Sequence, residues 1–160
     1  MHVACHGMSG IAIGDPAPDF TLEGTTGPFT LSEHRGEIVV LLFYPGDETP
    51  VCTKQFCSYR DTGLEGLGAT VVGISAQDLE SHQRFTTHHG LTVPLLADAD
   101  KKVAKAYGVS VPVVGTRRAV FVIDEDGVVR FKHVHMLGLD YLDADELRAA
   151  VEQTSAAAQA

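Results

Sequence analysis

Residues 38–57 read IVVLLFYPGDETPVCTKQFC, and this stretch decides the fold. Its first six residues, Ile38 to Phe43, are apolar without polar alternation, which is typical of a strand buried on both faces of a sheet. A loop with two prolines follows, and a helical pattern begins after Pro50. The stretch therefore predicts a strand, a tight loop and a helix, with Cys52 at the start of that helix.

A cysteine at a helix N-terminus faces unpaired backbone N–H groups and the positive end of the helix dipole, which both favour the nucleophilic thiolate. A second cysteine, Cys57, lies five positions further on. In an α-helix this spacing separates the Cα atoms by about 8.6 Å, whereas a disulfide needs them within about 7 Å. Either the two thiols never pair, or the first turns of the helix unwind during function.

The residues alone leave two other interpretations of the cysteine pair open. Free cysteines are often plain core residues, and both could pack on an apolar helix face. A zinc site would need further ligands, and His88 and His89 belong to a separate expected helix end, which makes this site a poor interpretation. The spacing also differs from the Cys-x-x-Cys of disulfide oxidoreductases, which argues against direct dithiol exchange.

Strand and helix patterns alternate along the rest of the chain. Apolar segments at 19–22 and 28–31 flank a turn and predict an N-terminal β-hairpin. We expect further strands at 70–75, 95–97, 119–123 and 128–132, and helices from Pro50 to about Glu65 and at 79–89, 101–107 and 143–153. In the last helix, Asp143 and Glu146 have the spacing of a capping box.

This order predicts parallel central strands, and the late hairpin predicts an antiparallel edge. The expected fold class is α/β: a thioredoxin-like sandwich with a central mixed sheet flanked by helices and an N-terminal β-hairpin extension. We expect one domain at residues 13–153, between a flexible N-terminal tail at 1–12 and a frayed C-terminal tail at 154–160. The first tail contains His2, Cys5 and His6, which we interpret as incidental rather than as a metal site.

Composition excludes several classes of function. The formal net charge of −9 argues against a nucleic-acid binder and against binding to an anionic membrane surface. No apolar run approaches the roughly 20 residues of a membrane helix. The N-terminal segment lacks a basic start followed by an apolar block, so we expect no secretory signal and a cytoplasmic protein. Three cysteines are too few for a disulfide scaffold.

The pattern Pro45-x-x-x-Thr49-x-x-Cys52 resembles the active-site signature of peroxiredoxins. The longer run through Gln55 and Cys57 is similar to the subgroup called bacterioferritin comigratory protein, or the Q type. Other segments resemble the family in the same order, and the similarity extends over roughly 13–153: 14–22, 72–75, 94–98, 106–109 and 118–124.

The resemblance implies a thiol-dependent peroxidase that reduces hydrogen peroxide and organic hydroperoxides. Cys52 would be the peroxidatic cysteine, oxidised to a sulfenic acid. Cys57 would resolve it as an intramolecular disulfide, and thioredoxin or a similar dithiol protein, such as a glutaredoxin-like one, would recycle the enzyme. The subgroup implies a monomer or a weak homodimer. No metal, flavin or nucleotide motif is present in the sequence, so no cofactor is expected.

The resemblance also assigns roles to four neighbours of the cysteines. Thr49 would hydrogen-bond the peroxide and the sulfur, and Pro45 would shield the pocket. Arg118 would pair with the thiolate and the peroxide, with Arg117 as the competing candidate on the same expected strand. Gln55 would orient the arginine, or be an ordinary solvated helix residue.

Two acidic residues, Asp47 and Glu48, precede the signature threonine, and we expect both to be exposed to solvent on the loop. The alternative function is a non-enzymatic redox sensor or partner-binding module on the same scaffold, in which helix opening transmits a signal. An added effector domain would favour that alternative, and the sequence shows none.

Overall fold

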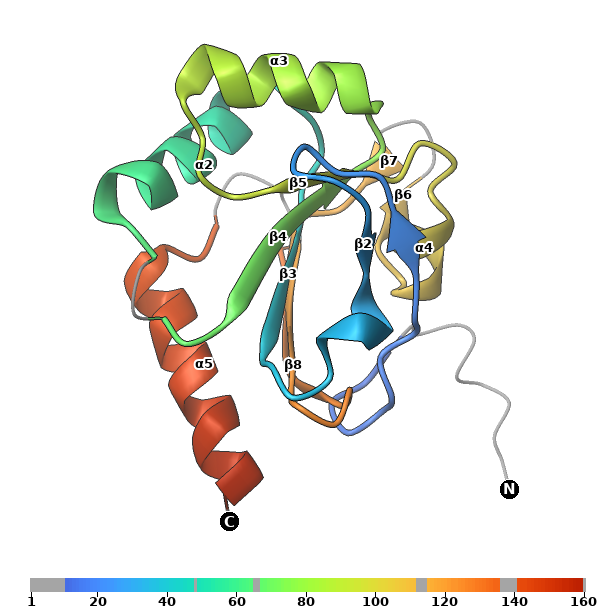
Figure 1. Ribbon diagram of the computed structural model, residues 1–160, viewed down its shortest axis with the longest axis vertical. Helices are drawn as coiled ribbons and strands as arrows, with labels where there is room; N and C mark the ends of the chain where they lie inside the picture. Colours follow the sequence, from blue (N-terminus) through green and yellow to red (C-terminus); the bar gives the residue numbers. More distant parts are fainter. Residues whose placement is uncertain (1–10, 48, 65–66, 112–114, 136–140, 160) are drawn as a thin grey trace.

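The computed structural model of the protein describes residues 11–47, 49–64, 67–111, 115–135 and 141–159. The strands are β1 (Thr21–Leu22), β2 (Phe29–Thr30), β3 (Val39–Phe43), β4 (Thr70–Ser75), β5 (Leu95–Ala97), β6 (Ser110–Val111), β7 (Gly115–Thr116), β8 (Ala119–Ile123) and β9 (Val129–Val134). The helices are the short 3₁₀ helix η1 (Leu31–His34) and the α-helices α2 (Pro50–Thr62), α3 (Leu79–His89), α4 (Lys102–Ala106) and α5 (Ala144–Gln159) (Figure 1).

The central sheet has five strands in the order β5-β4-β3-β8-β9. Strands β3, β4 and β5 are parallel to one another. Strand β8 pairs antiparallel with β3, and β9 pairs antiparallel with β8. The mixed sheet predicted from the order of elements is therefore confirmed. So is the N-terminal hairpin, because β1 and β2 pair antiparallel.

Strand β3 lies in the middle of the sheet and is buried throughout. Alternate side chains point to opposite faces, so Val40 and Leu42 pack in one hydrophobic cluster, while Leu41 and Phe43 pack in the other. The continuous apolar run is thus explained by two cores, one on each side of the sheet.

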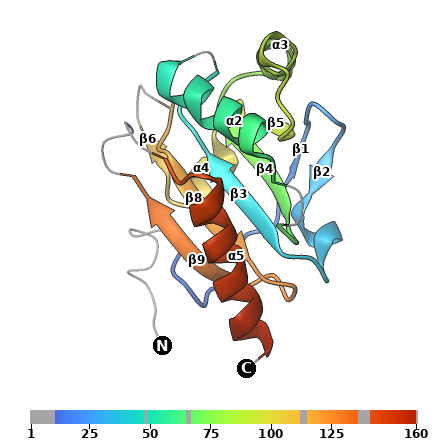
Figure 2. The same ribbon diagram turned by 90° about the vertical axis from the view of Figure 1, so that its left-hand side faces the viewer.

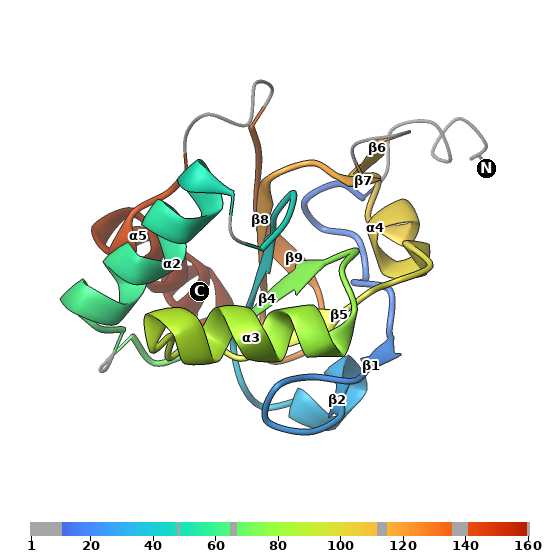
Figure 3. The ribbon, with the colours of Figure 1, turned by 90° about the horizontal axis from the view of Figure 1, so that it is seen from above.

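Helices cover both faces of the sheet. Figure 2 shows α2 and α5 lying against one face, where Phe56 of α2 and Leu147 of α5 are in the same cluster as Val40. Viewed from above, α4 lies on the opposite side, and α3 runs beside β5 (Figure 3). The β1–β2 hairpin belongs to the second face, where Phe29 packs. None of the described helices is long and apolar enough to cross a membrane.

Local sequence signals account for the ends of several helices. Asp78 accepts the backbone N–H of Ser81 at 2.8 Å and caps α3, which ends at Gly90 in the left-handed conformation with φ 61°. At the start of α5, Asp143 and Glu146 cap each other reciprocally, which confirms the predicted capping box. Helix α5 continues to Gln159, beyond the expected end at Gln153, because its final turns are rich in alanine.

Candidate active site

The loop between β3 and α2 places Cys52 in the first turn of α2. Thr49 is the N-cap of α2, Pro50 occupies the first turn, and Cys52 follows two residues later. The Cys52 side chain is fully buried beneath this turn, in the cluster shared by α2 and α5. The cysteine therefore has the helix N-terminal position that the sequence predicts.

Arg118 is brought to Cys52 by β8, the strand that pairs with β3: Arg118 immediately precedes Ala119, which lies opposite Phe43. Its guanidinium Nη2 donates to Cys52 Sγ at 3.1 Å, and the whole side chain is only 2% exposed. Arg118 lies just before β8 rather than within a strand. The neighbouring Arg117 is partly exposed, and its backbone N–H donates to Val109 O at 2.7 Å. Of the two candidate arginines, Arg118 is the one that contacts the cysteine.

Gln55 is buried and contacts the same arginine. Arg118 Nη1 donates to Gln55 Oε1, while Gln55 Nε2 donates to the hydroxyl of Tyr59 at 3.0 Å. Tyr59 in turn donates to the carbonyl of Leu142 at 2.6 Å. Burial raises the pKa of the Tyr59 hydroxyl, which keeps it a donor. The alternative of a solvated Gln55 is wrong, since its side chain is 1% exposed.

Thr49 and Pro45 lie in the loop over the cysteine and are both partly exposed. The Thr49 hydroxyl donates to the carbonyl of Gly46 at 3.0 Å and makes no side-chain capping bond to α2. Its lone pairs are therefore turned away from that carbonyl and can accept a hydrogen bond from a substrate.

Cys57 lies on the same intact helix as Cys52 and is partly exposed, whereas Cys52 is not exposed at all. Both thiols are free. Pairing them requires α2 to unwind, as the helical spacing indicates.

The expectation that Asp47 is exposed is wrong. Its carboxylate is 1% exposed and accepts hydrogen bonds from the Tyr44 hydroxyl at 2.6 Å, from the Ser81 hydroxyl at 2.7 Å and from His82 Nδ1 at 2.7 Å. Its backbone N–H also donates to Gln77 Oε1. The acidic residue therefore fastens the active-site loop to α3 rather than facing water. Glu48 lies outside the described residues.

The ionisation of this cluster follows from its partners. Burial opposes ionisation of Asp47, but the hydrogen bonds from His82 and Tyr44 outweigh it and hold the pKa of the carboxyl below its usual value. Burial and the nearby Asp47 raise the pKa of Tyr44 well above its usual value, so Tyr44 stays a donor. His82 Nδ1 lies 2.7 Å from the Asp47 carboxylate and its Nε2 lies 3.0 Å from the carbonyl of Leu96, so each ring nitrogen faces an acceptor.

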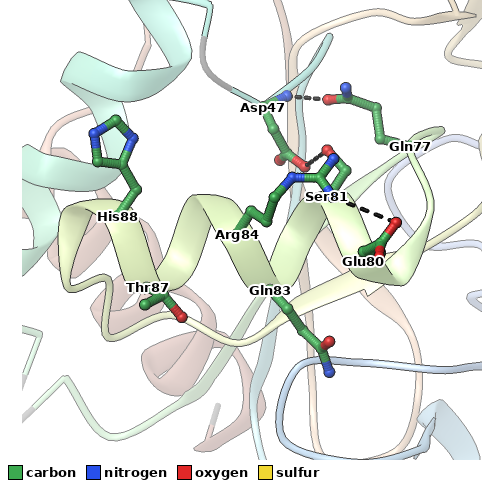
Figure 4. Close-up of a pocket in the computed structure, with 8 residues that line it drawn as sticks. All are labelled: Asp47, Gln77, Glu80, Ser81, Gln83, Arg84, Thr87 and His88. Carbon is green, nitrogen blue, oxygen red and sulfur yellow. Dashed lines mark hydrogen bonds and ion pairs between the residues drawn. The ribbon is translucent and has the colours of Figure 1, made fainter.

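Sequence reasoning missed His82 entirely. The available signal was its position three residues before Phe85 on the buried side of α3, where a polar side chain needs a partner. A pocket of about 750 Å³ lies along the outer side of α3. This pocket meets the active-site loop at Asp47 (Figure 4). Cys52 does not line this pocket, so the pocket is not where the sulfur reacts.

Metal-ligating side chains do not cluster in the described part of the chain, where no group of three or more His, Cys, Asp or Glu side chains is placed to hold an ion. His2, Cys5 and His6 lie outside the described residues.

Comparisons with known proteins agree with this geometry. A sequence model of the AhpC/TSA family matches residues 13–132. The chain is 42% identical to the chloroplastic peroxiredoxin Q of Oryza sativa over 126 residues, which are 76% of this chain and only 58% of the rice protein. It is 40% identical to a putative peroxiredoxin bcp of Coxiella burnetii over 129 residues, covering 74% of this chain and 85% of that protein. The crystal structure of peroxidoxin BcpB from Mycobacterium tuberculosis superposes with a TM-score of 0.77 at 34% identity, covering 88% of this chain and 96% of that one.

Proposed function

The chain belongs to the AhpC/TSA family, and on this basis we propose that it is a thiol-dependent peroxidase that reduces hydrogen peroxide and organic hydroperoxides at Cys52. The observation that carries the proposal is the 3.1 Å contact between Arg118 Nη2 and Cys52 Sγ inside the protein. A guanidinium has only donors, so the sulfur is the acceptor in this contact, and a thiolate accepts more strongly than a thiol.

The proposed first step is attack of the Cys52 thiolate on one oxygen of the peroxide. A sulfur–oxygen bond forms and the O–O bond breaks, so the sulfur is oxidised to a sulfenic acid. The other oxygen leaves as hydroxide or alkoxide, takes up a proton and departs as water or alcohol.

Most of the rate must come from groups that stabilise the departing oxygen. Lowering the pKa of a free thiol from about 8.5 to about 6 raises its ionised fraction at neutral pH about thirtyfold. The nucleophilicity of the thiolate falls at the same time, which reduces this gain roughly tenfold with the Brønsted slope of disulfide exchange. Preorganised donors provide the rest, and Arg118 and the N–H groups at the start of α2 are placed for it.

In the second proposed step, Cys57 attacks the sulfenic acid, a disulfide forms and water leaves. Because Cys52 is fully buried and both cysteines lie on one helix, α2 has to open for this step. Opening also exposes the resulting disulfide to the reductant. The disulfide then accepts two electrons from a dithiol protein of the thioredoxin or glutaredoxin kind. We further propose a cytoplasmic location and a monomer or weak homodimer.

The test is consumption of NADPH in a mixture of the protein, thioredoxin, thioredoxin reductase and a hydroperoxide. Wild-type protein is expected to sustain many turnovers and the variant Cys52→Ser none. A single stoichiometric oxidation without turnover, with glutaredoxin also inactive, would support the redox-sensor alternative and overturn the peroxidase proposal.

A further inference from the structure

A continuous series of hydrogen bonds runs along the buried side of α2, from the reactive sulfur to a backbone carbonyl just before α5. It passes from Cys52 Sγ through Arg118 and Gln55 to Tyr59, and it ends at Leu142 O. We propose that Tyr59 is a positioning residue for the peroxidase reaction, which holds Gln55 in the orientation that keeps Arg118 on the sulfur. This inference rests on the proposed function, because it concerns the rate of the same step.

The direction of every bond in the chain is set from its far end. A carbonyl only accepts, so the Tyr59 proton must point to Leu142 and the Tyr59 oxygen is left as an acceptor. That acceptor selects the NH₂ end of the Gln55 amide, which turns the amide oxygen toward Arg118. Arg118 then has one guanidinium nitrogen on Gln55 and the other on Cys52.

The Leu142 end of this series of hydrogen bonds is held in place by α5 and by packing. Leu142 immediately precedes Asp143, whose reciprocal bonds with Glu146 fix the start of α5. The Tyr59 ring is fully buried and packs edge-on against Phe56, with ring centroids 5.8 Å apart. Tyr59 therefore links the start of α5 to Arg118 through Gln55, although it does not contact the sulfur itself.

Removing only the hydroxyl, in Tyr59→Phe, leaves the buried NH₂ of Gln55 without its acceptor. The Gln55 side chain then moves to give its NH₂ another partner, and its hydrogen bond with Arg118 weakens. We expect oxidation of Cys52 by hydrogen peroxide to slow by about five- to tenfold, measured in single-turnover stopped flow.

A second substitution separates positioning from mere packing. A glutamate at position 55 has two acceptor oxygens and no NH₂, so it binds Arg118 without needing an acceptor behind it. With Tyr59 present, one of its oxygens faces a tyrosine oxygen whose proton is already given to Leu142. We therefore expect Gln55→Glu to be slower than wild type, and the double variant Gln55→Glu/Tyr59→Phe to be faster than either single variant.

Tyr107→Phe is the matched control. Tyr107 is also buried and donates to a backbone carbonyl, that of Pro18 at 2.7 Å, but it packs on the opposite face of the sheet. Its loss should lower the free energy of unfolding without changing the rate of Cys52 oxidation.

The experiment compares these four variants with wild type in the same stopped-flow assay, with unfolding by urea recorded for each. A rate for Tyr59→Phe equal to that of wild type, or a double variant no faster than Tyr59→Phe, overturns the inference. An equal slowing in Tyr107→Phe also overturns it, because the effect would then follow stability alone. If Tyr59→Phe does not fold, Gln55→Glu decides, and a wild-type rate in that variant contradicts the inference. Inactive wild-type protein would instead reject the peroxidase function.

Discussion

Replacing Asp47 by alanine removes the anion that joins the active-site loop to α3. The Asp47 side chain is 1% exposed, and its carboxylate accepts three side-chain hydrogen bonds, from Tyr44, Ser81 and His82. In the alanine variant all three donors lose this acceptor, and two of them, the Tyr44 hydroxyl and His82 Nδ1, are fully buried. Each buried polar group left without a partner costs about 1–3 kcal/mol, so the expected loss is about 2–6 kcal/mol.

Replacing Asp47 by asparagine should cost much less. The amide oxygen can still accept from Tyr44, and the amide NH₂ can donate to His82 Nδ1 in the tautomer that carries its proton on Nε2 and donates it to Leu96 O. The Ser81 hydroxyl loses its carboxylate acceptor, but it is partly exposed and can turn to water. The buried groups keep partners, so the expected loss is about 1–2 kcal/mol.

The difference between wild type and the alanine variant should depend on pH. The folded protein lowers the pKa of Asp47 below its ordinary value of 3.8. The carboxylate therefore stabilises the fold fully above the unfolded value, and this stabilisation is lost as the pH falls below 3.8 and through the lower folded pKa. The advantage of wild type over Asp47→Ala should thus be constant near neutrality and shrink in acid.

Urea unfolding followed by circular dichroism, at neutral pH and at several pH values below about 4, measures these differences. Asp47→Asn is the matched control, because it keeps the shape of the side chain and the hydrogen bond from Tyr44. Equal destabilisation by alanine and asparagine, or a loss below about 1 kcal/mol for alanine, would refute the role of the Asp47 carboxylate in holding this loop.

The remaining predictions concern the reaction. Cys57→Ser should keep the first oxidation by peroxide but lose turnover with thioredoxin. Mass spectrometry of the oxidised wild-type protein should show a disulfide between Cys52 and Cys57. A disulfide to Cys5 instead would contradict the assignment of Cys57. Arg118→Met should slow single-turnover oxidation by about a hundredfold or more, as the loss of one preorganised donor does elsewhere; a change below tenfold would speak against its role. Thr49→Val should slow the same step at least about tenfold while lowering the free energy of unfolding by only about 1 kcal/mol, since its hydroxyl contacts one carbonyl; an unchanged rate would reject a contact with peroxide.

The sequence predicts best those elements whose signals are local. The bounds of β4 and α3 agree with the expected ranges 70–75 and 79–89, because β4 is an apolar run and α3 is bounded by the N-cap Asp78 and by Gly90. Strands β6 and β7 were not predicted. Arg118 was expected within a strand and lies just outside one.

Long-range partners account for what local patterns could not predict in the site. Asp47 follows proline and glycine and has the appearance of a solvated loop residue, yet its partner His82 is 35 positions away in the chain. The carbonyl that orients Tyr59 is 83 positions away. Burial of a polar side chain depends on such partners, and only the folded chain brings them together.

The hydrogen-bond chain has opposite consequences for the two steps of the proposed reaction. Gln55 lies between the two cysteines on α2, so unwinding the residues that separate them must break its bonds to Arg118 and Tyr59. The contacts that hold Arg118 on the thiolate therefore also stabilise the helix against opening. Oxidation to the sulfenic acid removes the negative charge from the sulfur, and a hydrogen bond without charge assistance is roughly half as strong. The first step thus weakens the hydrogen bond between Arg118 and Cys52. It thereby lowers the free-energy cost of unwinding α2, which the second step requires.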